Sequence, residues 1–289
     1  MHMQAEEVVI DARGLAIAAL RWNAGAPCRV LCVHGWLDNA ASFTEIAPQL
    51  PGCDVVAIDL PGHGRSAHRG GGTMQHFIEY VADVVAVLDA LGWDHAVLLG
   101  HSLGAGVMAC VAGIAPERVR AVLLLEGIAP QPAVPEKILE SLRAAIEAGQ
   151  RGAGDSAGYV DFDAAIVARR KGYWPLSDEV SRRILERALT PARDSVLHWH
   201  TDSRLRQASA MRLVEGQVAA LLGAIRAPVL LVGADRGLFA TQEAHAARLA
   251  NIAGLEYVCL PGSHHLHLEP ETAPAVADLL HTFIAHHTG

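Results

Sequence analysis

The sequence predicts an α/β fold in which a mostly parallel sheet is covered by helices on both faces. Short apolar runs rich in branched residues recur along the chain, and segments with apolar residues at helical spacing separate them. Runs that are apolar on both faces are typical of central strands in a parallel sheet. With 289 residues, of which 51% are hydrophobic, the chain is long enough to bury a large core.

The expected elements follow one another along the chain in a regular order. The segments 8–10 and 15–20 are expected to form a leading hairpin, because Arg13 and Gly14 between them favour a turn. Apolar runs predict the later strands at 30–33, 55–58, 96–99, 122–125, 229–232 and 257–260. Helical spacing of apolar residues predicts helices at 77–91, 107–114 and 276–283.

The interval from 128 to 217 breaks this alternation. It contains no convincing buried strand, and its pattern predicts helices at 136–148, 162–170 and 178–189. Ser177 is placed to cap the last of these helices. We therefore expect residues 129–216 to form a helical cap, inserted into an α/β core made of residues 1–128 and 217–289.

Charge and composition exclude several classes of function. The net charge is −8 and no run rich in lysine and arginine occurs, so a nucleic-acid partner is not expected. The first ten residues do not resemble a signal peptide, and no apolar segment approaches the length of a membrane span. We therefore expect a cytoplasmic protein with no membrane partner.

The cysteines also exclude one kind of site. The chain has five of them, and they lack the paired spacing of zinc ribbons. We expect most of them to be small buried residues in a reducing compartment. No metal site is expected from this pattern.

The most specific motif is the stretch from Gly100 to Gly104, which reads G-x-S-x-G with Ser102 at its centre. It follows a predicted strand and precedes a segment with helical spacing, which is the context of a nucleophile elbow. The glycines leave room for a serine at strained backbone angles, and the helix directs free N–H groups toward it. Ser102 is therefore the candidate nucleophile.

A serine nucleophile needs a base and hydrogen-bond donors for the oxyanion. The loop after the last predicted strand contains three histidines, and its G-x-H spacing favours His264 as the base, with His265 as the alternative. The strand at 30–33 ends at a His-Gly pair ahead of Trp36. The backbone N–H groups of Trp36 and Leu103 are the expected oxyanion hole.

Two carboxylates are candidates for the acid that orients the base. Asp235 follows the predicted strand at 229–232, which is the common position, but it lies one residue early for the usual spacing. Glu126 ends the apolar strand at 122–125, where a charged group is costly unless it is paired. A histidine that becomes positively charged is a suitable partner. The spacing favours Glu126 and keeps Asp235 as the alternative.

In this order the motifs resemble the α/β-hydrolase superfamily across nearly the whole chain. The segments 34–36, 59–66 and 100–104 and the loop around His264 carry the resemblance. The segments 34–39 and 125–130 resemble the serine-hydrolase-like branch, which is related to haloalkane dehalogenases and epoxide hydrolases. The resemblance implies a mostly parallel eight-stranded sheet with the helical cap inserted after the sixth strand. In some haloalkane dehalogenases the acid stands at the position that matches Glu126.

The resemblance also implies a reaction. Dehalogenases and epoxide hydrolases attack with an aspartate, whereas a serine attacks an acyl carbon. We therefore expect a serine hydrolase, in particular a carboxylesterase for small acyl esters, with no metal or organic cofactor. Perhydrolysis, C–C bond hydrolysis and a lyase reaction can use the same triad, and a non-catalytic receptor on this fold is a further alternative. The expected partner is a small acyl substrate, and the expected state is a monomer or homodimer.

Overall fold

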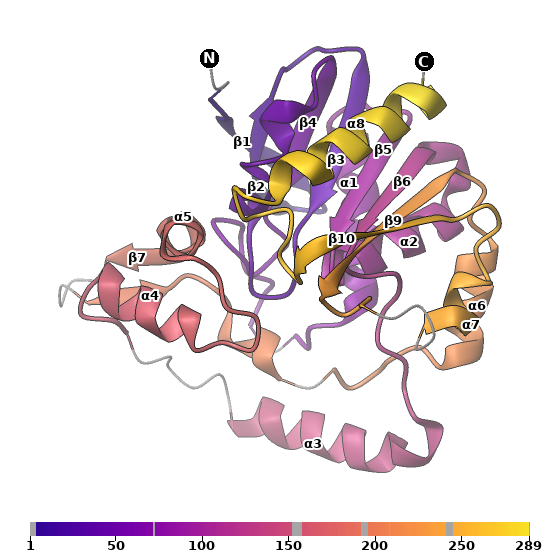
Figure 1. Ribbon diagram of the computed structural model, residues 1–289. Helices are drawn as coiled ribbons and strands as arrows, with labels where there is room; N and C mark the ends of the chain where they lie inside the picture. Colours follow the sequence, from indigo (N-terminus) through magenta and orange to yellow (C-terminus); the bar gives the residue numbers. More distant parts are fainter. Residues whose placement is uncertain are drawn as a thin grey trace.

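An eight-stranded sheet, in the order β1-β2-β4-β3-β5-β6-β9-β10, forms the centre of the molecule (Figure 1). The computed structural model describes residues 4–71, 73–151, 158–191, 196–207, 209–240 and 245–288. The strands of the sheet are β1 (Glu6–Ala12), β2 (Leu15–Trp22), β3 (Cys28–Val33), β4 (Cys53–Ile58), β5 (Ala96–His101), β6 (Val119–Leu125), β9 (Val229–Arg236) and β10 (Glu256–Ser263). β2 pairs antiparallel with β1 and with β4, and the other neighbours pair parallel, which confirms the predicted sheet.

The central strands are covered on both faces. Every residue of β4 and β5 is buried, which explains why their sequences are apolar throughout. The helices α1 (Phe77–Ala90), α2 (Leu103–Ile114) and α6 (Glu215–Gly223) pack on one face. On the other face lie α8 (Ala273–Thr288) and two 3-10 turns, Ala40–Phe43 and Ala47–Gln49. Because the six strands from β3 onward run parallel, their carboxyl ends meet at one edge of the sheet.

The chain between β6 and β9 forms helices where the sequence predicts them. These are α3 (Ile138–Arg151), α4 (Phe162–Arg170) and α5 (Asp178–Ala188), on the side toward which the arrows of β9 and β10 point (Figure 1). The Ser177 side chain accepts a hydrogen bond from the Val180 N–H and so caps α5. The division of the chain at 128 and 217 stays a prediction, and α6 begins two residues before the second boundary.

Among the described residues the interval holds no long buried strand, but it does contain two short strands. β7 (Leu189–Pro191) and β8 (Leu197–Trp199) pair antiparallel beside α5. Each has three residues, which is too short for alternation to be recognised in the sequence. A short helix, α7 (Ala246–Leu249), precedes β10.

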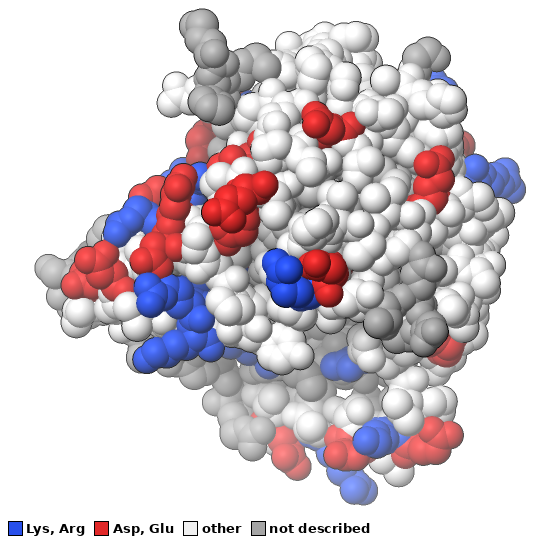
Figure 2. All heavy atoms as spheres, in the orientation of Figure 1, with Lys and Arg blue, Asp and Glu red and all other residues white. Residues whose placement is uncertain are grey.

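Charged side chains of both signs are interspersed on the face drawn in Figure 2, mainly over the α3, α4 and α5 regions. Much of the surface around α8 on this face carries neither sign (Figure 2). Among the helices of the described residues, none is both long and apolar enough to cross a bilayer. The absence of a nucleic-acid partner and the cytoplasmic location stay predictions.

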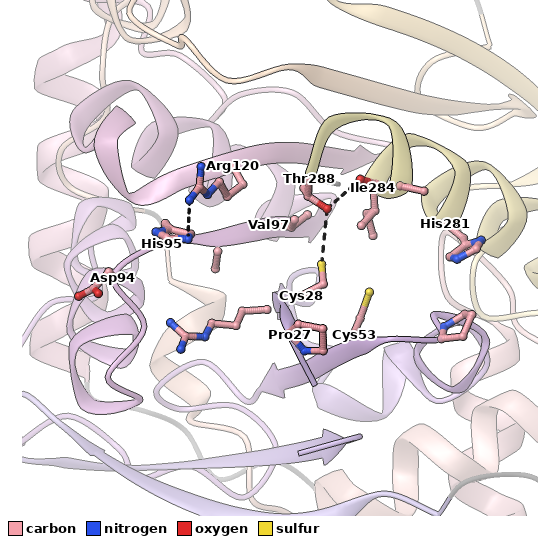
Figure 3. Close-up of a pocket in the computed structure, with 14 residues that line it drawn as sticks. Pro27, Cys28, Cys53, Asp94, His95, Val97, Arg120, His281, Ile284 and Thr288 are labelled. Atoms are coloured by element: carbon pink, nitrogen blue, oxygen red, sulfur yellow. Dashed lines mark hydrogen bonds between the residues drawn. The ribbon is translucent and has the colours of Figure 1, made fainter. Parts of the chain in front are cut away.

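The cysteines are unpaired, and three of the five are buried, namely Cys32, Cys53 and Cys110. Cys28 and Cys53 line a pocket of about 880 Å³ at the amino ends of β3, β4 and β5. Figure 3 shows the Cys28 sulfur directed toward Thr288 of α8, 3.9 Å from its hydroxyl oxygen. A hydrogen bond from the Cys53 thiol lowers the pKa of Cys28 to about 7. This pocket contains none of the predicted site residues, which lie at the other end of the strands.

A buried ion pair joins α5 to the core. The Arg187 Nε atom lies 3.0 and 2.9 Å from the two carboxylate oxygens of Asp59, which follows β4. The two side chains are 5% and 0% exposed. Asp59 also accepts hydrogen bonds from the backbone N–H groups of Ala40 and Arg65, both at 2.7 Å. This carboxylate is therefore neutralised and fully hydrogen-bonded only while α5 is in place.

Replacing Arg187 with methionine is expected to lower the free energy of unfolding by about 3–5 kcal/mol, because Asp59 would stay buried without its cation. Urea denaturation of the two proteins measures this difference. Arg170→Met is the matched control, because the Arg170–Asp178 pair is 54% and 62% exposed and should contribute less than about 1 kcal/mol. A loss for Arg187→Met no larger than that of the control would contradict the prediction.

Buried histidines make stability depend on pH. His63 is fully buried against His34 and Tyr80, and this burial, together with the nearby His34, lowers the pKa of His63 to about 3. The unfolded chain therefore binds a proton near pH 6.5 that the native protein does not bind. The free energy of unfolding is expected to fall below pH 6.5, by up to about 1.4 kcal/mol per pH unit for this group.

Urea denaturation at several values between pH 7.5 and pH 5 tests this expectation. His63→Asn should make the decline with falling pH shallower, whatever its effect at pH 7.5. His286→Asn, on the exposed surface of α8, is the control for removing a histidine. An equal decline in the wild type and in His63→Asn would refute the assignment.

Candidate active site

Ser102 stands between β5 and α2 with a φ of 51°. This left-handed conformation is strained for a serine, and the neighbouring glycines permit it. A Cβ atom on Gly104 would overlap the backbone oxygen of Val33, and one on Gly100 would overlap that of Gly104. The G-x-S-x-G pattern is therefore required by the close approach of α2 to β3 and to its own turn.

Strained backbone is concentrated at this edge of the sheet. Leu37, Ser102 and Glu126 have φ values of 62°, 51° and 51°, and they follow β3, β5 and β6. Among the described residues, the other non-glycine residues with positive φ are Arg13 and Asn23, which lie in turns. Strain of this kind persists where the surrounding structure holds it and often marks a functional site.

Glu126 and His264 form a buried pair at this edge. The His264 Nδ1 atom lies 3.0 Å from the Glu126 Oε2 atom, and the side chains are 5% and 0% exposed. Backbone N–H groups of Ala234 and Leu238 donate to the same carboxylate at 2.7 and 2.5 Å. A Cβ atom on Gly237 would overlap this carboxylate. Hydrogen-bond donors of the protein thus take the place of water around the buried Glu126 carboxylate.

Asp235, the alternative acid, lies elsewhere. Its side chain is 49% exposed and pairs with Arg236, 3.2 Å away. Its Oδ1 atom accepts a hydrogen bond from the Gly262 N–H at 2.9 Å. The structure therefore brings Glu126 to His264 and leaves Asp235 at the surface, where it accepts a hydrogen bond from the carboxyl end of β10.

His265, the alternative base, has a different partner. Its Nε2 atom lies 3.3 Å from the Oδ2 atom of Asp38, which is also buried. Ser102, His264 and His265 line one pocket, whose volume is about 580 Å³. Trp174 of the inserted segment stacks on the His264 ring at 5.0 Å between centroids.

The predicted oxyanion donors border the same pocket. Trp36 lines it, and the Trp36 side chain is 53% exposed and donates its ring N–H to the Leu205 oxygen at 3.1 Å. Leu103 begins α2, so its backbone N–H belongs to the first turn, where a helix offers no acceptor. The role of these two N–H groups stays a prediction.

The sequence model of the protein family described as alpha/beta hydrolase fold matches residues 29–271 of this chain. The chain belongs to the α/β-hydrolase family. It is similar to a serine hydrolase-like protein of Dictyostelium discoideum, with 30% identity over 93% of this chain and 79% of that protein. A serine hydrolase-like protein of Danio rerio is 32% identical over 88% of this chain and 82% of that protein.

A solved structure also supports the assignment of this chain to the α/β-hydrolase family. The crystal structure of the hypothetical protein PA1622 from Pseudomonas aeruginosa PAO1 has a TM-score of 0.91 and 36% identity, and the match covers 97% of this chain and 99% of that one. The fold and the resemblance predicted from the sequence are therefore confirmed. At the level that these relatives support, the chain is a serine hydrolase-like α/β hydrolase.

Several groups that line the pocket of this hydrolase were not predicted from the sequence. Asp38, His101 and Arg169 come together there, with the Arg169 guanidinium 3.5 Å from Asp38. In the described part of the chain, Asp38, His101 and His265 are the group whose ligand atoms are close enough to hold a metal ion. Asp38 lies in the segment 34–39 that carried the resemblance, but its partners are 63 to 227 residues away, so no local signal revealed them.

Proposed function

We propose that this hydrolase is a carboxylesterase that cleaves small acyl esters through an acyl-enzyme on Ser102. The observation that carries the proposal is the buried Glu126–His264 pair, which opens on the same pocket as the strained Ser102. A serine, a histidine and a carboxylate held in this way are the parts that acyl transfer requires.

In the proposed reaction each ring nitrogen of His264 has a separate role. The Nδ1 atom faces Glu126, so the Nε2 atom is left to accept the Ser102 hydroxyl proton. The serine oxygen then bonds to the ester carbonyl carbon, and the oxyanion receives hydrogen bonds from the Trp36 and Leu103 N–H groups. The leaving alcohol takes the proton from His264. A water molecule, deprotonated by His264, then hydrolyses the acyl-enzyme and releases the acid.

The inserted segment forms part of the pocket wall beside these residues. Its aromatic side chains Tyr159, Tyr173, Trp174 and Trp199 line the pocket together with Trp36. Such a lining excludes water and favours an apolar acyl group. The volume of about 580 Å³ lies within the range of small-molecule sites.

Covalent labelling with a fluorophosphonate tests the proposal. The folded protein should gain one phosphonyl group, and peptide mass spectrometry should locate it on Ser102. A panel of p-nitrophenyl esters of rising chain length then measures the acyl preference, which we expect to favour short chains. A folded protein that is not labelled at Ser102 would overturn the assignment as a serine hydrolase. Labelling of Ser102 without hydrolysis of any ester would leave the assignment as a serine hydrolase standing and would refute only the proposed ester substrate.

A further inference from the structure

We propose that Asp38, His101 and His265 form a binding site for one divalent transition-metal ion in the wall of the pocket. Their ligand atoms lie within 4.8 Å of one another. The Asp38 Oδ2 atom is 3.3 Å from the His265 Nε2 atom and 4.0 Å from the His101 Nδ1 atom. Donors about 2.0–2.2 Å from a zinc ion lie roughly 3–3.5 Å apart. The distance from Asp38 to His265 already fits, and the distance from Asp38 to His101 must shorten by roughly 0.5–1 Å.

The hydrogen bonding of His101 favours a cation beside its ring. Its Nε2 atom lies 3.0 Å from the backbone oxygen of His264, which can only accept, so the Nε2 atom carries the hydrogen. The Nδ1 atom therefore presents a lone pair. It is buried, has no hydrogen-bond partner among the described residues, and faces a carboxylate oxygen of Asp38. Two electron-rich atoms that face each other in a buried place are stabilised by a cation between them.

The local backbone leaves room for the ion. A Cβ atom at Gly35 would lie 2.8 Å from the His101 Nδ1 atom and 3.2 Å from the Asp38 Oδ2 atom. Glycine at this position therefore keeps clear the space beside two of the donors. All three donor residues also line the 580 Å³ pocket, which gives an ion a path from solvent.

The donors select the class of ion. Two imidazole nitrogens and one carboxylate oxygen suit zinc, cobalt, nickel or copper, whereas magnesium and calcium prefer an all-oxygen set. Arg169 lies 3.5 Å from Oδ1, the other oxygen of Asp38. An ion at Oδ2 would replace the hydrogen bond from the His265 Nε2 atom, whose proton is released when the metal binds. Three protein ligands leave coordination positions open toward the pocket.

Titration calorimetry with zinc chloride on the full chain, after treatment with EDTA, tests the site. We expect one ion per chain, no binding of magnesium, and a rise in thermal stability with zinc. Cobalt(II) should give the visible absorption of a bound ion. Asp38→Asn and His265→Asn should each weaken zinc binding about 100-fold or more, with circular dichroism to verify folding.

Surface histidines supply the matched control. His286 and His287 are adjacent near the end of α8 and could bind zinc adventitiously. Replacing both with asparagine should leave the affinity unchanged. The proposal is overturned if the wild type binds no zinc, if that double variant loses the binding, or if both Asp38→Asn and His265→Asn retain it.

One consequence rests on the proposed esterase function. An ion at this site would occupy the pocket beside Ser102 and His264, so zinc should inhibit ester hydrolysis and EDTA should restore it. Asp38→Asn should lose this sensitivity to zinc. Zinc binding by a protein that hydrolyses no ester would leave the metal site standing and refute the esterase proposal alone.

Discussion

Replacing Ser102 with alanine is expected to lower kcat for a short p-nitrophenyl ester by about 10⁶-fold, because the acyl-enzyme can no longer form. Ser102 stands at the one position where β5 turns into α2 beside the Glu126–His264 pair. The residual rate would come from binding and from the oxyanion donors alone. Steady-state kinetics with freshly purified protein measures the loss, and fluorophosphonate labelling should disappear with it.

Ser209→Ala is the matched control for this variant. Ser209 donates its hydroxyl to the Met211 oxygen on the surface, away from the pocket, and its loss should leave kcat unchanged. Alanine keeps the backbone conformation of this turn and removes only the hydroxyl, so the fold should be retained as judged by circular dichroism. A folded Ser102→Ala protein that keeps a tenth or more of its activity would show that another group is the nucleophile.

Replacing Glu126 with glutamine is expected to lower kcat by about 10⁴-fold. The Glu126 carboxylate accepts from His264 Nδ1 at 3.0 Å, which leaves the Nε2 atom of that ring free to act as the base. An amide nitrogen at that place would favour the other tautomer and could not stabilise the positive ring. The variant should also be less stable, because two backbone N–H groups donate to the same carboxylate.

Asp235→Asn is the control that decides between the two acids. Asp235 pairs with Arg236 at the surface, so its change should alter kcat less than about threefold. A loss confined to kcat with KM unchanged, in a variant that circular dichroism shows to be folded, separates positioning from structure. A large loss for Asp235→Asn together with a small loss for Glu126→Gln would reverse the assignment.

The fold could be predicted because its signals are local. The runs that became β3, β4, β5 and β6 are apolar on both faces, and each can be recognised within six or seven residues. The turn around Ser102 could also be predicted from a short stretch of sequence, because close contacts of the turn with its neighbours require Gly100 and Gly104. The strands β7 and β8 were not predicted, because a segment of three residues is too short to show an alternating pattern.

The fold, the candidate nucleophile and a short list of its partners could be predicted from the sequence alone. Which carboxylate reaches which histidine depends on the tertiary structure. It placed Glu126 at His264 across 138 residues and Asp38 at His265 across 227 residues, and it left Asp235 exposed. The reason is physical: adjacent parallel strands bring their ends together whatever their separation along the chain, and burial then makes each charge depend on a partner that local sequence does not reveal.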